Sequence, residues 1–448
     1  MTRTVAIIGG GITGITAALT AAASGDDVHL FEAAPQLGGK IAEAELAGKT
    51  IPTGPDAFLA RRPEVTDLAT SLGLESSLIS PVARSARIYR DGTLHPLPPN
   101  VLGVPATADL SPGLLSAEGI ERLAQDLDAP DDRPDGDESV GDMVRRRLGD
   151  EVLEFVVDPL LGGINAGDSD RLSLRSGVPQ LDALRQRDPS LVRAGATTLA
   201  AAPSNPPPVF HSIDGGLNRL IDAAQQQLIE RGVTLHLGSE ANIEQTGESW
   251  NIVWADSMIA ADHVVITTAA PAASKVLQTV DPATAELLAE IDYSSVALLV
   301  LILPGDTIDI DRAISGVLVP RLCGLGVTAV SFASHKWPSL GDDGSQVVRV
   351  SVGRRTNIGW QELTDEDLTT MVSDDLATIF DTAIPEGPTH ITRWMKSLPQ
   401  YDVDHYGLIA RIDQSLQTRP GLTLTGAWRN GLGLPACVAA GIDAVTSA

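Results

Sequence analysis

Hydrophobic and polar positions at the start of the chain follow the order of a strand, a turn, a helix and a second strand. Residues 4–8 are apolar and largely β-branched, which is typical of a buried strand. The alanine-rich residues 15–23 favour a helix, because alanine has the highest helix propensity. Residues 27–31 repeat the strand pattern. We therefore predict that the first forty residues form one compact supersecondary unit.

The turn between the first strand and the helix has the glycine spacing of a dinucleotide site. Gly9 permits a tight turn, Gly11 lets a pyrophosphate approach the backbone, and Gly14 lets the helix pack closely on the strand. The first N–H groups of the helix can bind phosphate. Glu32 ends the second strand, where its carboxylate can accept both hydroxyls of an unphosphorylated ribose. These residues predict a site for the ADP half of a dinucleotide, with NAD and FAD both open.

A second glycine pair, Gly38-Gly39, follows Glu32 and favours FAD. In flavoenzymes that resemble glutathione reductase and amine oxidase, such a pair carries the chain over the FAD pyrophosphate, whereas NAD dehydrogenases rarely have one. The fold class expected is therefore α/β, with a Rossmann-like FAD-binding domain of this type and an α+β substrate part.

The middle of the chain alternates between helical and extended patterns. Helical spacing predicts helices over residues 64–72, 116–127 and 139–157, and residues 210–216 are expected to open a further helix that ends near Gly232. The acidic residues 128–138 are interpreted as a solvated connection.

Short β-rich runs separated by turns predict a sheet dominated by antiparallel pairing, the usual floor of a substrate domain. These runs are residues 296–303, 316–320, 327–333 and 347–353. The pair Asp91-Gly92 predicts a hairpin over residues 86–98. The chain closes with a strand, a glycine loop and a helix that begins at Pro435, and the start of such a helix can stabilise negative charge on a reduced flavin.

A proline-rich break at residues 202–208 indicates that the chain crosses between domains more than once. We predict an FAD-binding domain, a mainly helical domain over a substrate chamber, and a substrate-binding domain with a mixed or antiparallel sheet. The FAD-binding domain comprises residues 1–80, 206–275 and 394–448. The helical domain comprises residues 81–205, and the substrate-binding domain comprises residues 276–393.

Composition narrows the function. A net charge of −26 over 448 residues argues against nucleic acid and disfavours adsorption on anionic lipid, because cations are needed for both. Cys323 and Cys437 fit no metal spacing and are interpreted as reduced thiols. No export signal is recognised, and the longest apolar run, residues 296–303, is too short to span a membrane. We expect a cytoplasmic protein without a metal.

Three motifs resemble one family. They are Leu-Gly-Gly-Lys-Ile at residues 37–41, Gly-Pro-Asp-Ala-Phe-Leu-Ala-Arg at 54–61 and Pro-Leu-Leu-Gly-Gly-Ile-Asn-Ala-Gly-Asp at 159–168. In these motifs the chain resembles the oxygen-dependent porphyrinogen oxidases, which include protoporphyrinogen oxidase and its bacterial coproporphyrinogen III relative, within the FAD-dependent amine oxidase-like superfamily. The resemblance covers the whole chain and is densest at both ends.

The resemblance implies non-covalent FAD, with the Gly-Pro-Asp turn against the isoalloxazine ring and the backbone near residue 241 at the adenine. Together with the glycine turns, it gives the cofactor-binding residues expected here: Gly9, Gly11, Ile12, Thr13, Gly14, Glu32, Ala33, Gly38, Gly39, Lys40, Gly54, Pro55, Asp56, Ala57, Ala241, Trp394, Gly426, Gly433, Leu434 and Pro435.

For the substrate, the resemblance implies a porphyrinogen, whose propionates suit arginine and lysine. The candidates are Arg61, Arg84, Arg87, Asn165 and Lys336. No catalytic side chain is assigned, because hydride transfer to the flavin N5 atom needs no strong base. The histidines are interpreted as packed or solvated, and the pair Asp374-Asp375 as surface.

The reaction implied is the six-electron oxidation of coproporphyrinogen III to coproporphyrin III in haem biosynthesis, with three O₂ reduced to three H₂O₂. Partners would be the porphyrinogen, O₂ and the next enzyme of the pathway, with peripheral membrane contact seen in some relatives. Protoporphyrinogen IX remains the close alternative substrate. A flavin amine oxidase, a carotenoid-type desaturase and a non-catalytic flavin-binding protein also remain open, although aromatic residues, which frame the flavin in amine oxidases, are only 4% of the chain.

Overall fold

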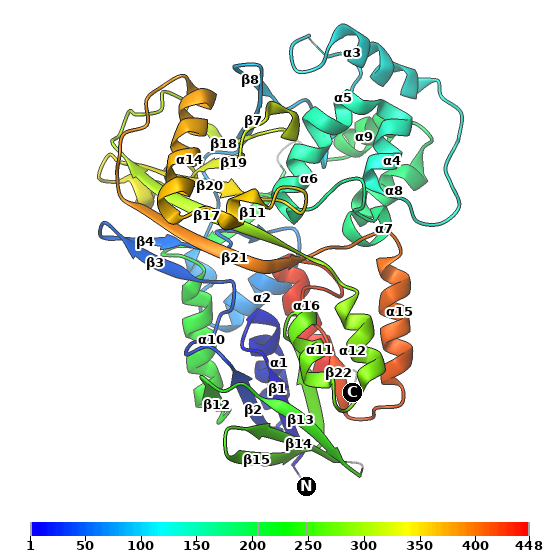
Figure 1. Ribbon diagram of the computed structural model, residues 1–448, viewed down its shortest axis with the longest axis vertical. Helices are drawn as coiled ribbons and strands as arrows, with labels where there is room; N and C mark the ends of the chain where they lie inside the picture. The colour runs from blue at the N-terminus through cyan, green and yellow to red at the C-terminus, as the bar shows by residue number, and fades with distance from the viewer. Residues whose placement is uncertain (1, 111, 204–205, 248, 447–448) are drawn as a thin grey trace.

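The computed structural model describes residues 2–110, 112–203, 206–247 and 249–446. A parallel five-stranded sheet in the order β12-β2-β1-β16-β22 forms the lower half of the molecule, where both ends of the chain lie (Figure 1). Its strands are β1 (Thr4–Ile8), β2 (Asp27–Glu32), β12 (Thr234–Leu237), β16 (His263–Ile266) and β22 (Leu422–Leu424). The first two strands confirm the predicted opening unit.

Two apolar layers cover this sheet. One packs against the sheet through buried side chains such as Ile15 and Val438, from α1 (Ile12–Ala23), α2 (Pro63–Ser71), α10 (Asn218–Glu230) and α16 (Leu434–Thr446). The other holds Trp250 and Leu277, from the antiparallel ribbon β13 (Asn242–Thr246), β14 (Ser249–Trp254) and β15 (Ser257–Ala261), and from α11 (Ala270–Leu277), α12 (Pro282–Ala289) and α15 (His405–Leu416).

A seven-stranded sheet in the order β21-β17-β20-β19-β18-β7-β8 lies above the first sheet (Figure 1). Its strands are β7 (Ser85–Arg90), β8 (Thr93–Pro96), β17 (Tyr293–Leu303), β18 (Ile314–Leu318), β19 (Val327–Phe332), β20 (Gln346–Val352) and β21 (Thr389–Pro399). Every pair is antiparallel except β18 with β7, so the predicted antiparallel sheet and the Asp91-Gly92 hairpin are confirmed.

Helix α14 (Asp365–Phe380) packs on this sheet through Leu368, Val372 and Leu376. Asp374 and Asp375 were predicted to lie at the surface, and this prediction was wrong for Asp375. This carboxylate is buried and accepts the N–H groups of Gly326 and Val327 at 2.8 and 2.9 Å, so it fastens the helix to the start of β19.

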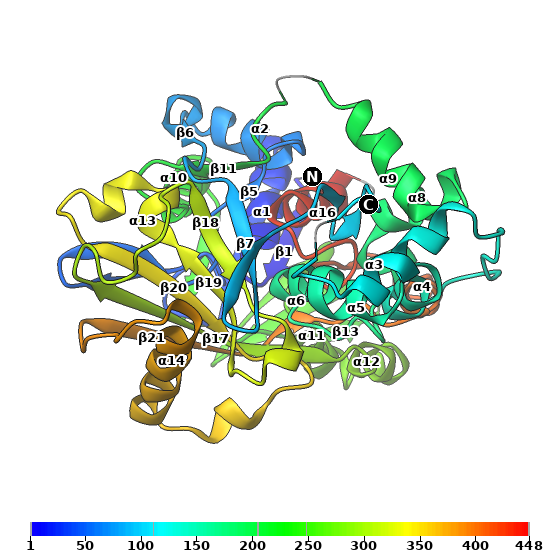
Figure 2. The ribbon, with the colours of Figure 1, turned by 90° about the horizontal axis from the view of Figure 1, so that it is seen from above.

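A helical unit stands beside the seven-stranded sheet (Figure 2). It comprises α3 (Ala117–Ala124), α4 (Val140–Leu148), α5 (Asp150–Val152), α6 (Asp158–Asn165), α7 (Leu174–Gly177), α8 (Pro179–Arg187) and α9 (Leu191–Ala200). The helix predicted over residues 139–157 is interrupted at Gly149, whose φ of +92° ends α4, and continues through a π-helical turn over Leu153–Val157.

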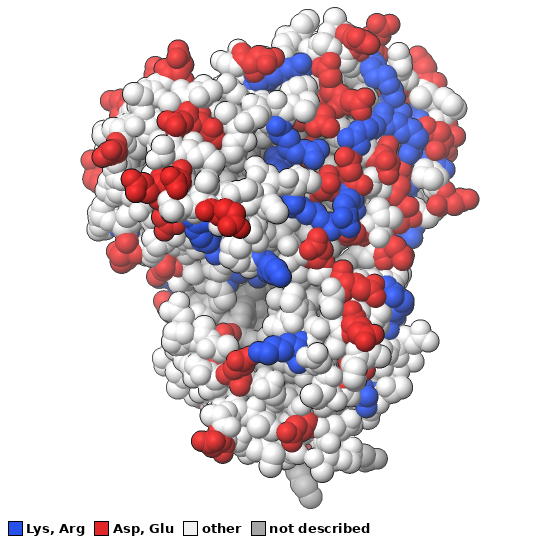
Figure 3. Space-filling model, in the orientation of Figure 1, with Lys and Arg blue, Asp and Glu red and all other residues white. Residues whose placement is uncertain are grey.

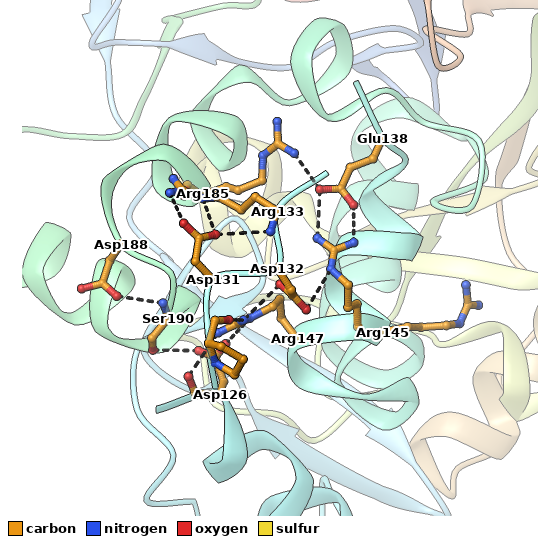
Figure 4. A network of polar contacts seen from close by, with 12 residues as sticks. Asp126, Asp131, Asp132, Arg133, Glu138, Arg145, Arg147, Arg185, Asp188 and Ser190 are labelled. Atoms are coloured by element: carbon orange, nitrogen blue, oxygen red, sulfur yellow. Dashed lines mark hydrogen bonds and ion pairs between the residues drawn. The ribbon is translucent and has the colours of Figure 1, made fainter. Parts of the chain in front are cut away.

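The acidic segment 128–138 is a largely exposed connection, as predicted, except at its last residue. Glu138 is 7% exposed and pairs with Arg146 and with Arg185, while Asp132 pairs with Arg147 at 3.1 Å (Figure 4). Arg146 and Arg147 come from α4, which follows the segment directly, whereas Arg185 comes from α8, 47 residues after Glu138, and periodicity along one segment does not reveal it. Figure 3 shows the result on the surface, where basic and acidic side chains are interleaved over the helical unit.

Short strands connect the larger parts. They are the hairpin β3 (Glu43–Leu46) and β4 (Lys49–Pro52), the three-stranded set β5 (Phe58–Leu59), β6 (Leu78–Ile79) and β11 (Phe210–Ile213), and the pair β9 (Asn100–Val101) and β10 (Val104–Pro105). Residues 210–213 therefore form a strand before α10 begins, where a helix opening was predicted. The predicted break at residues 202–208 includes 204–205, which lie outside the described residues. Within the described ranges, no helix is long and apolar enough to cross a membrane.

Candidate functional site

The turn between β1 and α1 depends on glycine. Gly9 has a φ of +115° and donates its N–H to the carbonyl of Phe31 at 2.8 Å. A Cβ on Gly14 would lie 1.8 Å from the Gly9 oxygen, so only glycine lets the helix approach this closely. A Cβ on Gly11, by contrast, would meet no described atom within 4 Å. The turn is tight on one side and open on the other, which leaves room for a ligand beside Gly11.

The N-terminus of α1 begins at this opening. Gly11 is the N-cap, and no side chain among the described residues caps the helix. The first-turn N–H groups, which include those of Ile12 and Thr13, have no partner within the helix and carry the positive end of its dipole. A diphosphate is a chemically suitable partner for them.

The second glycine pair packs directly onto the first turn. Gly38 donates its N–H to the Gly10 carbonyl at 2.9 Å, and a Cβ on Gly39 would lie 3.3 Å from Gly11 Cα. Gly54 in turn packs on Lys40, whose carbonyl oxygen would lie 1.8 Å from a Cβ at residue 54. Three glycine-dependent turns are thus stacked, and two of them border the open space at Gly11.

Glu32 is fixed at the carboxyl end of β2. One carboxylate oxygen accepts the Gly10 N–H and the other accepts the Ala34 N–H, both at 2.7 Å. The chain also passes this point a second time, since the Ser239 N–H donates to the Glu32 carbonyl and the Gly238 N–H to the Ala34 carbonyl, both at 2.8 Å. Each carboxylate oxygen keeps a second lone pair for a hydroxyl.

Asp56 lies on the Gly54–Ala57 turn and is held by side chains from strand β20 and from the end of the short helix at residues 333–336. Its Oδ2 atom is 2.6 Å from Lys336 Nζ, 3.0 Å from Arg349 Nη1 and 3.1 Å from Trp337 Nε1. Arg349 also donates to the Gly54 carbonyl at 2.5 Å. Burial alone would raise the pKa of Asp56, but the Arg349 and Lys336 charges and the hydrogen bonds outweigh it and hold this pKa well below its usual range.

Trp394 joins the same region, because its indole N–H on β21 donates to the Thr53 carbonyl at 2.7 Å. The turn that carries Pro55 and Asp56 is therefore tied to both β20 and β21. Strands of the seven-stranded sheet therefore help to fix the position of this turn.

The C-terminal glycine loop runs from Gly426 to Gly433 and leads into α16, which begins at Leu434, one residue before the predicted Pro435. Helix α16 crosses α1 closely, since a Cβ on Gly441 would lie 2.4 Å from the Thr13 oxygen. Trp428 is 1% exposed and its indole donates to the Thr268 carbonyl at 3.2 Å, so it is a core residue and presents no free aromatic face.

The substrate-binding candidates come from separate elements. Arg61 and Arg84 are exposed, Arg87 is half-buried on β7, Asn165 is buried at the end of α6, and Lys336 ends the short helix α13 (Ala333–Lys336). Among the described residues no hydrogen bond joins any two of them. The Arg84 segment does lie beside Lys336, because the Val82 N–H donates to the Lys336 carbonyl at 3.0 Å. Lys336 itself is engaged by Asp56.

Sequence analysis missed Arg349, Trp337 and Tyr401. Arg349 had a signal, because a charged residue inside the apolar run of β20 is buried only when it has a partner. Tyr401 had none, since its partners are 26 and 30 residues away in the chain. No group of three His, Cys, Asp or Glu side chains gathers as metal ligands would in the described part of the chain.

Glycine turns are stacked at the carboxyl end of a parallel sheet, and an acidic residue ends its second strand. This arrangement is typical of oxidoreductases that bind a nucleotide cofactor. The chain belongs to the flavin containing amine oxidoreductase family, whose model matches residues 12–447. The chain is therefore a flavin-dependent oxidoreductase.

Relatives of this chain carry a narrower name. It is 32% identical to the coproporphyrinogen III oxidase of Bacillus subtilis, over 99% of this chain and 97% of that protein, and equally similar to that of Mycobacterium tuberculosis, over the same shares. A crystal structure named as a putative protoporphyrinogen oxidase, from Exiguobacterium, superposes with a TM-score of 0.88 at 31% identity and covers 100% of this chain and 98% of that one.

Proposed function

We propose that this protein holds FAD non-covalently and oxidises coproporphyrinogen III to coproporphyrin III. The observation that carries the proposal is the full-length similarity to coproporphyrinogen III oxidases, at 32% identity over 99% of the chain. The resemblance of its motifs to the porphyrinogen oxidases supports the same substrate.

FAD is preferred to smaller flavins because the cradle suits a dinucleotide. We assign the diphosphate to the open side of Gly11, between Gly38-Gly39 and the first turn of α1, and the ribose to Glu32. The adenine then belongs near Ala33 and Ala241. On this assignment, the Gly54–Ala57 turn and the loop that ends at Gly433, Leu434 and Pro435 meet the flavin ring.

The balance of the reaction is simple. When bound at the glycine turns and Glu32, a flavin would supply a hydride acceptor for the substrate and a route for the electron pairs to O₂, with three such oxidations needed for each macrocycle. The porphyrinogen loses six electrons and six protons, and three O₂ become three H₂O₂. The work left for the protein is to bind and orient the macrocycle and to keep water away.

Residues of this chain suit those tasks. The Asp56, Lys336 and Arg349 group holds the ring-facing turn in one position. Arg61, Arg84, Arg87 and Asn165 are proposed to bind propionates or line the chamber, and Lys336 contributes through Asp56 rather than as a free cation. No described side chain needs to act as a strong base.

Protoporphyrinogen IX is the second candidate, favoured by the name of the Exiguobacterium structure. It carries two propionates where coproporphyrinogen III carries four. An amine oxidase activity is disfavoured by the burial of Trp428, which leaves no aromatic frame at the C-terminal loop among the residues described there.

The deciding experiment incubates the purified flavin-loaded protein in air with each porphyrinogen and follows porphyrin fluorescence and H₂O₂. We expect faster turnover of coproporphyrinogen III and one H₂O₂ for each electron pair. Faster turnover of protoporphyrinogen IX would reverse the substrate assignment. A loaded protein that oxidises neither would leave a desaturase or a non-catalytic flavin protein as the better reading.

We further propose a cytoplasmic location, supported by two free thiols, Cys323 and Cys437. Hand-over of the product to the next enzyme of the pathway and peripheral membrane contact complete the proposal. Fractionation of cells that express a tagged protein, with and without salt, tests the location and the membrane contact together.

A further inference from the structure

The side chain of Tyr401 bridges two backbone groups of the C-terminal glycine loop. Tyr401 donates its O–H to the Ala427 carbonyl at 2.5 Å and accepts the Gly431 N–H at 2.7 Å. The ring is buried, with 5% of the residue exposed. One side chain therefore joins both ends of residues 427–431.

A histidine supports the same loop. His405 stacks on Tyr401 with ring centroids 4.3 Å apart, and its Nε2 atom lies 2.8 Å from the Trp428 carbonyl. Because a carbonyl only accepts hydrogen bonds, this imidazole carries a proton on Nε2. The middle of the loop is thus held as well as its ends.

The segment that supplies these side chains is itself fastened on its other side. The Ser173 N–H donates to the Tyr401 carbonyl at 2.7 Å, and the Val403 N–H donates to the Arg171 carbonyl at 3.0 Å. The Gln400 amide donates to the Asn165 carbonyl at 3.0 Å. Residues 400–405 consequently lie between the helical unit and the glycine loop.

The loop needs such support. Gly426 and Gly431 have φ values of +139° and +133°, and glycines give up more conformational freedom on ordering than other residues. The buried Trp428 side chain anchors the middle of the loop in the core, and the hydrogen bonds from Tyr401 and His405 fix the backbone on either side of the glycines.

We infer that Tyr401 is a positioning residue for the flavin: its hydroxyl holds the 427–431 loop in the conformation that meets the ring, with His405 as a second support. The inference rests on the proposed placement of the flavin at this loop. The role proposed for Tyr401 is to hold the loop, and it includes no direct contact between Tyr401 and the flavin.

The test compares Tyr401→Phe with Tyr406→Phe, a matched control five residues away that is 69% exposed. Flavin affinity, the visible circular dichroism of the bound flavin and its reduction potential are measured, with thermal unfolding of the flavin-free protein as the check on folding. Tyr401→Phe should weaken flavin binding on the order of tenfold, the loss of two ordinary hydrogen bonds, and should alter the dichroism and the potential. Tyr406→Phe should match the wild type.

Equal affinity, dichroism and potential in the two variants would overturn the inference. Flavin binding is measured without porphyrinogen, so a protein that binds flavin normally but oxidises neither substrate would refute the proposed reaction and leave this test intact.

Hydrogen exchange of the wild-type protein provides a measurement that needs no variant. The Gly431 amide should be protected to the same degree as the amides of α16 in the flavin-free protein. Exchange at the rate of an unsupported loop would overturn the inference even if Tyr401→Phe failed to fold.

Discussion

The Lys336 ammonium lies 2.6 Å from the Asp56 carboxylate, although the two residues are 280 positions apart in the chain. This contact ties the turn after β4 to the helix that follows β19. Since Arg349 shares the same carboxylate oxygen, one acid compensates a buried cation, Arg349, and a partly buried one, Lys336.

Replacing that acid should therefore be costly. Asp56→Asn leaves Lys336 and Arg349 without a counter-charge and should destabilise the protein by roughly 3 kcal/mol at neutral pH, as the loss of one partner of a buried pair does. Because the folded-state pKa of Asp56 is depressed, its stabilisation is present above the unfolded pKa and is lost as the pH falls. Chemical denaturation should show a constant gap between wild type and variant from pH 7 down to about pH 4 and a gap that narrows as the pH falls further; a gap that stays constant below pH 4 would contradict the pairing.

Two glycine substitutions separate folding from flavin binding. Gly14→Ala should unfold or strongly destabilise the protein, because its Cβ would lie 1.8 Å from the Gly9 oxygen. Gly11→Ala meets no described protein atom and has φ −72°, a value that alanine adopts freely, so the flavin-free protein should melt near the wild-type temperature.

The flavin affinity of Gly11→Ala should nonetheless fall, because the methyl group occupies the space assigned to the pyrophosphate. Fluorescence titration of the flavin-free protein measures it. Wild-type affinity in this variant would move the pyrophosphate away from Gly11.

Glu32→Ala should lose charge-assisted hydrogen bonds to the ribose worth roughly 1.5–3 kcal/mol, so flavin should be lost during purification. The variant also frees the Gly10 and Ala34 N–H groups that the carboxylate now accepts. Glu32→Gln is the control for side-chain size and retains one acceptor oxygen. Its flavin content should lie between that of the wild type and that of Glu32→Ala. Full flavin content in Glu32→Ala would show that the ribose is held elsewhere.

His263 makes the parallel sheet sensitive to acid. Burial, together with the Arg3 charge, lowers the pKa of this imidazole to about 4, while its Nε2 atom faces the Thr423 hydroxyl at 2.9 Å. In the unfolded chain His263 is protonated near pH 6.5, whereas in the folded protein it stays neutral down to about pH 4. The free energy of unfolding should therefore fall by about 3 kcal/mol between pH 6.5 and 4. His263→Gln, which cannot titrate, should flatten this part of the curve; an unchanged slope would assign the acid sensitivity to other groups.

Arg87 tests the substrate side. Arg87→Ala should raise the KM for the tetracarboxylate while flavin content and the melting temperature stay near wild type, because its Nη1 contacts only the Ala86 carbonyl at 3.2 Å among the described protein groups. Arg62→Ala is the control, since that guanidinium is exposed and paired with Glu64 at 2.9 Å. Identical kinetics in the two variants would remove Arg87 from the chamber.

Sequence alone predicted the features that are encoded locally. The turn at Gly9 and the strand that delivers Glu32 lie within 24 residues, so spacing and apolar pattern describe them together. The hairpin at Asp91-Gly92 is equally local, because both residues must take positive φ and the dipeptide favours it.

Features that depend on distant partners were missed. Glu138 looked like a solvent-facing acid until Arg185, 47 residues away, was placed beside it, and Asp375 looked the same until the amides at the start of β19 were placed. The pairing of Lys336 with Asp56 changed a free cation for substrate into a residue that holds a turn. A charged side chain is buried only where the fold places a partner beside it, and a partner from a distant segment is known only from the fold.

The strand order β12-β2-β1-β16-β22 has a consequence for biogenesis. The nucleotide cradle is written in the first forty residues, but the edge strand β22 and helix α16, which packs across α1, come from the last thirty. A nascent chain exposes the face of α1 that α16 covers until residues 434–446 have been synthesised. The packing that holds α1 on the parallel sheet is therefore completed only late in synthesis.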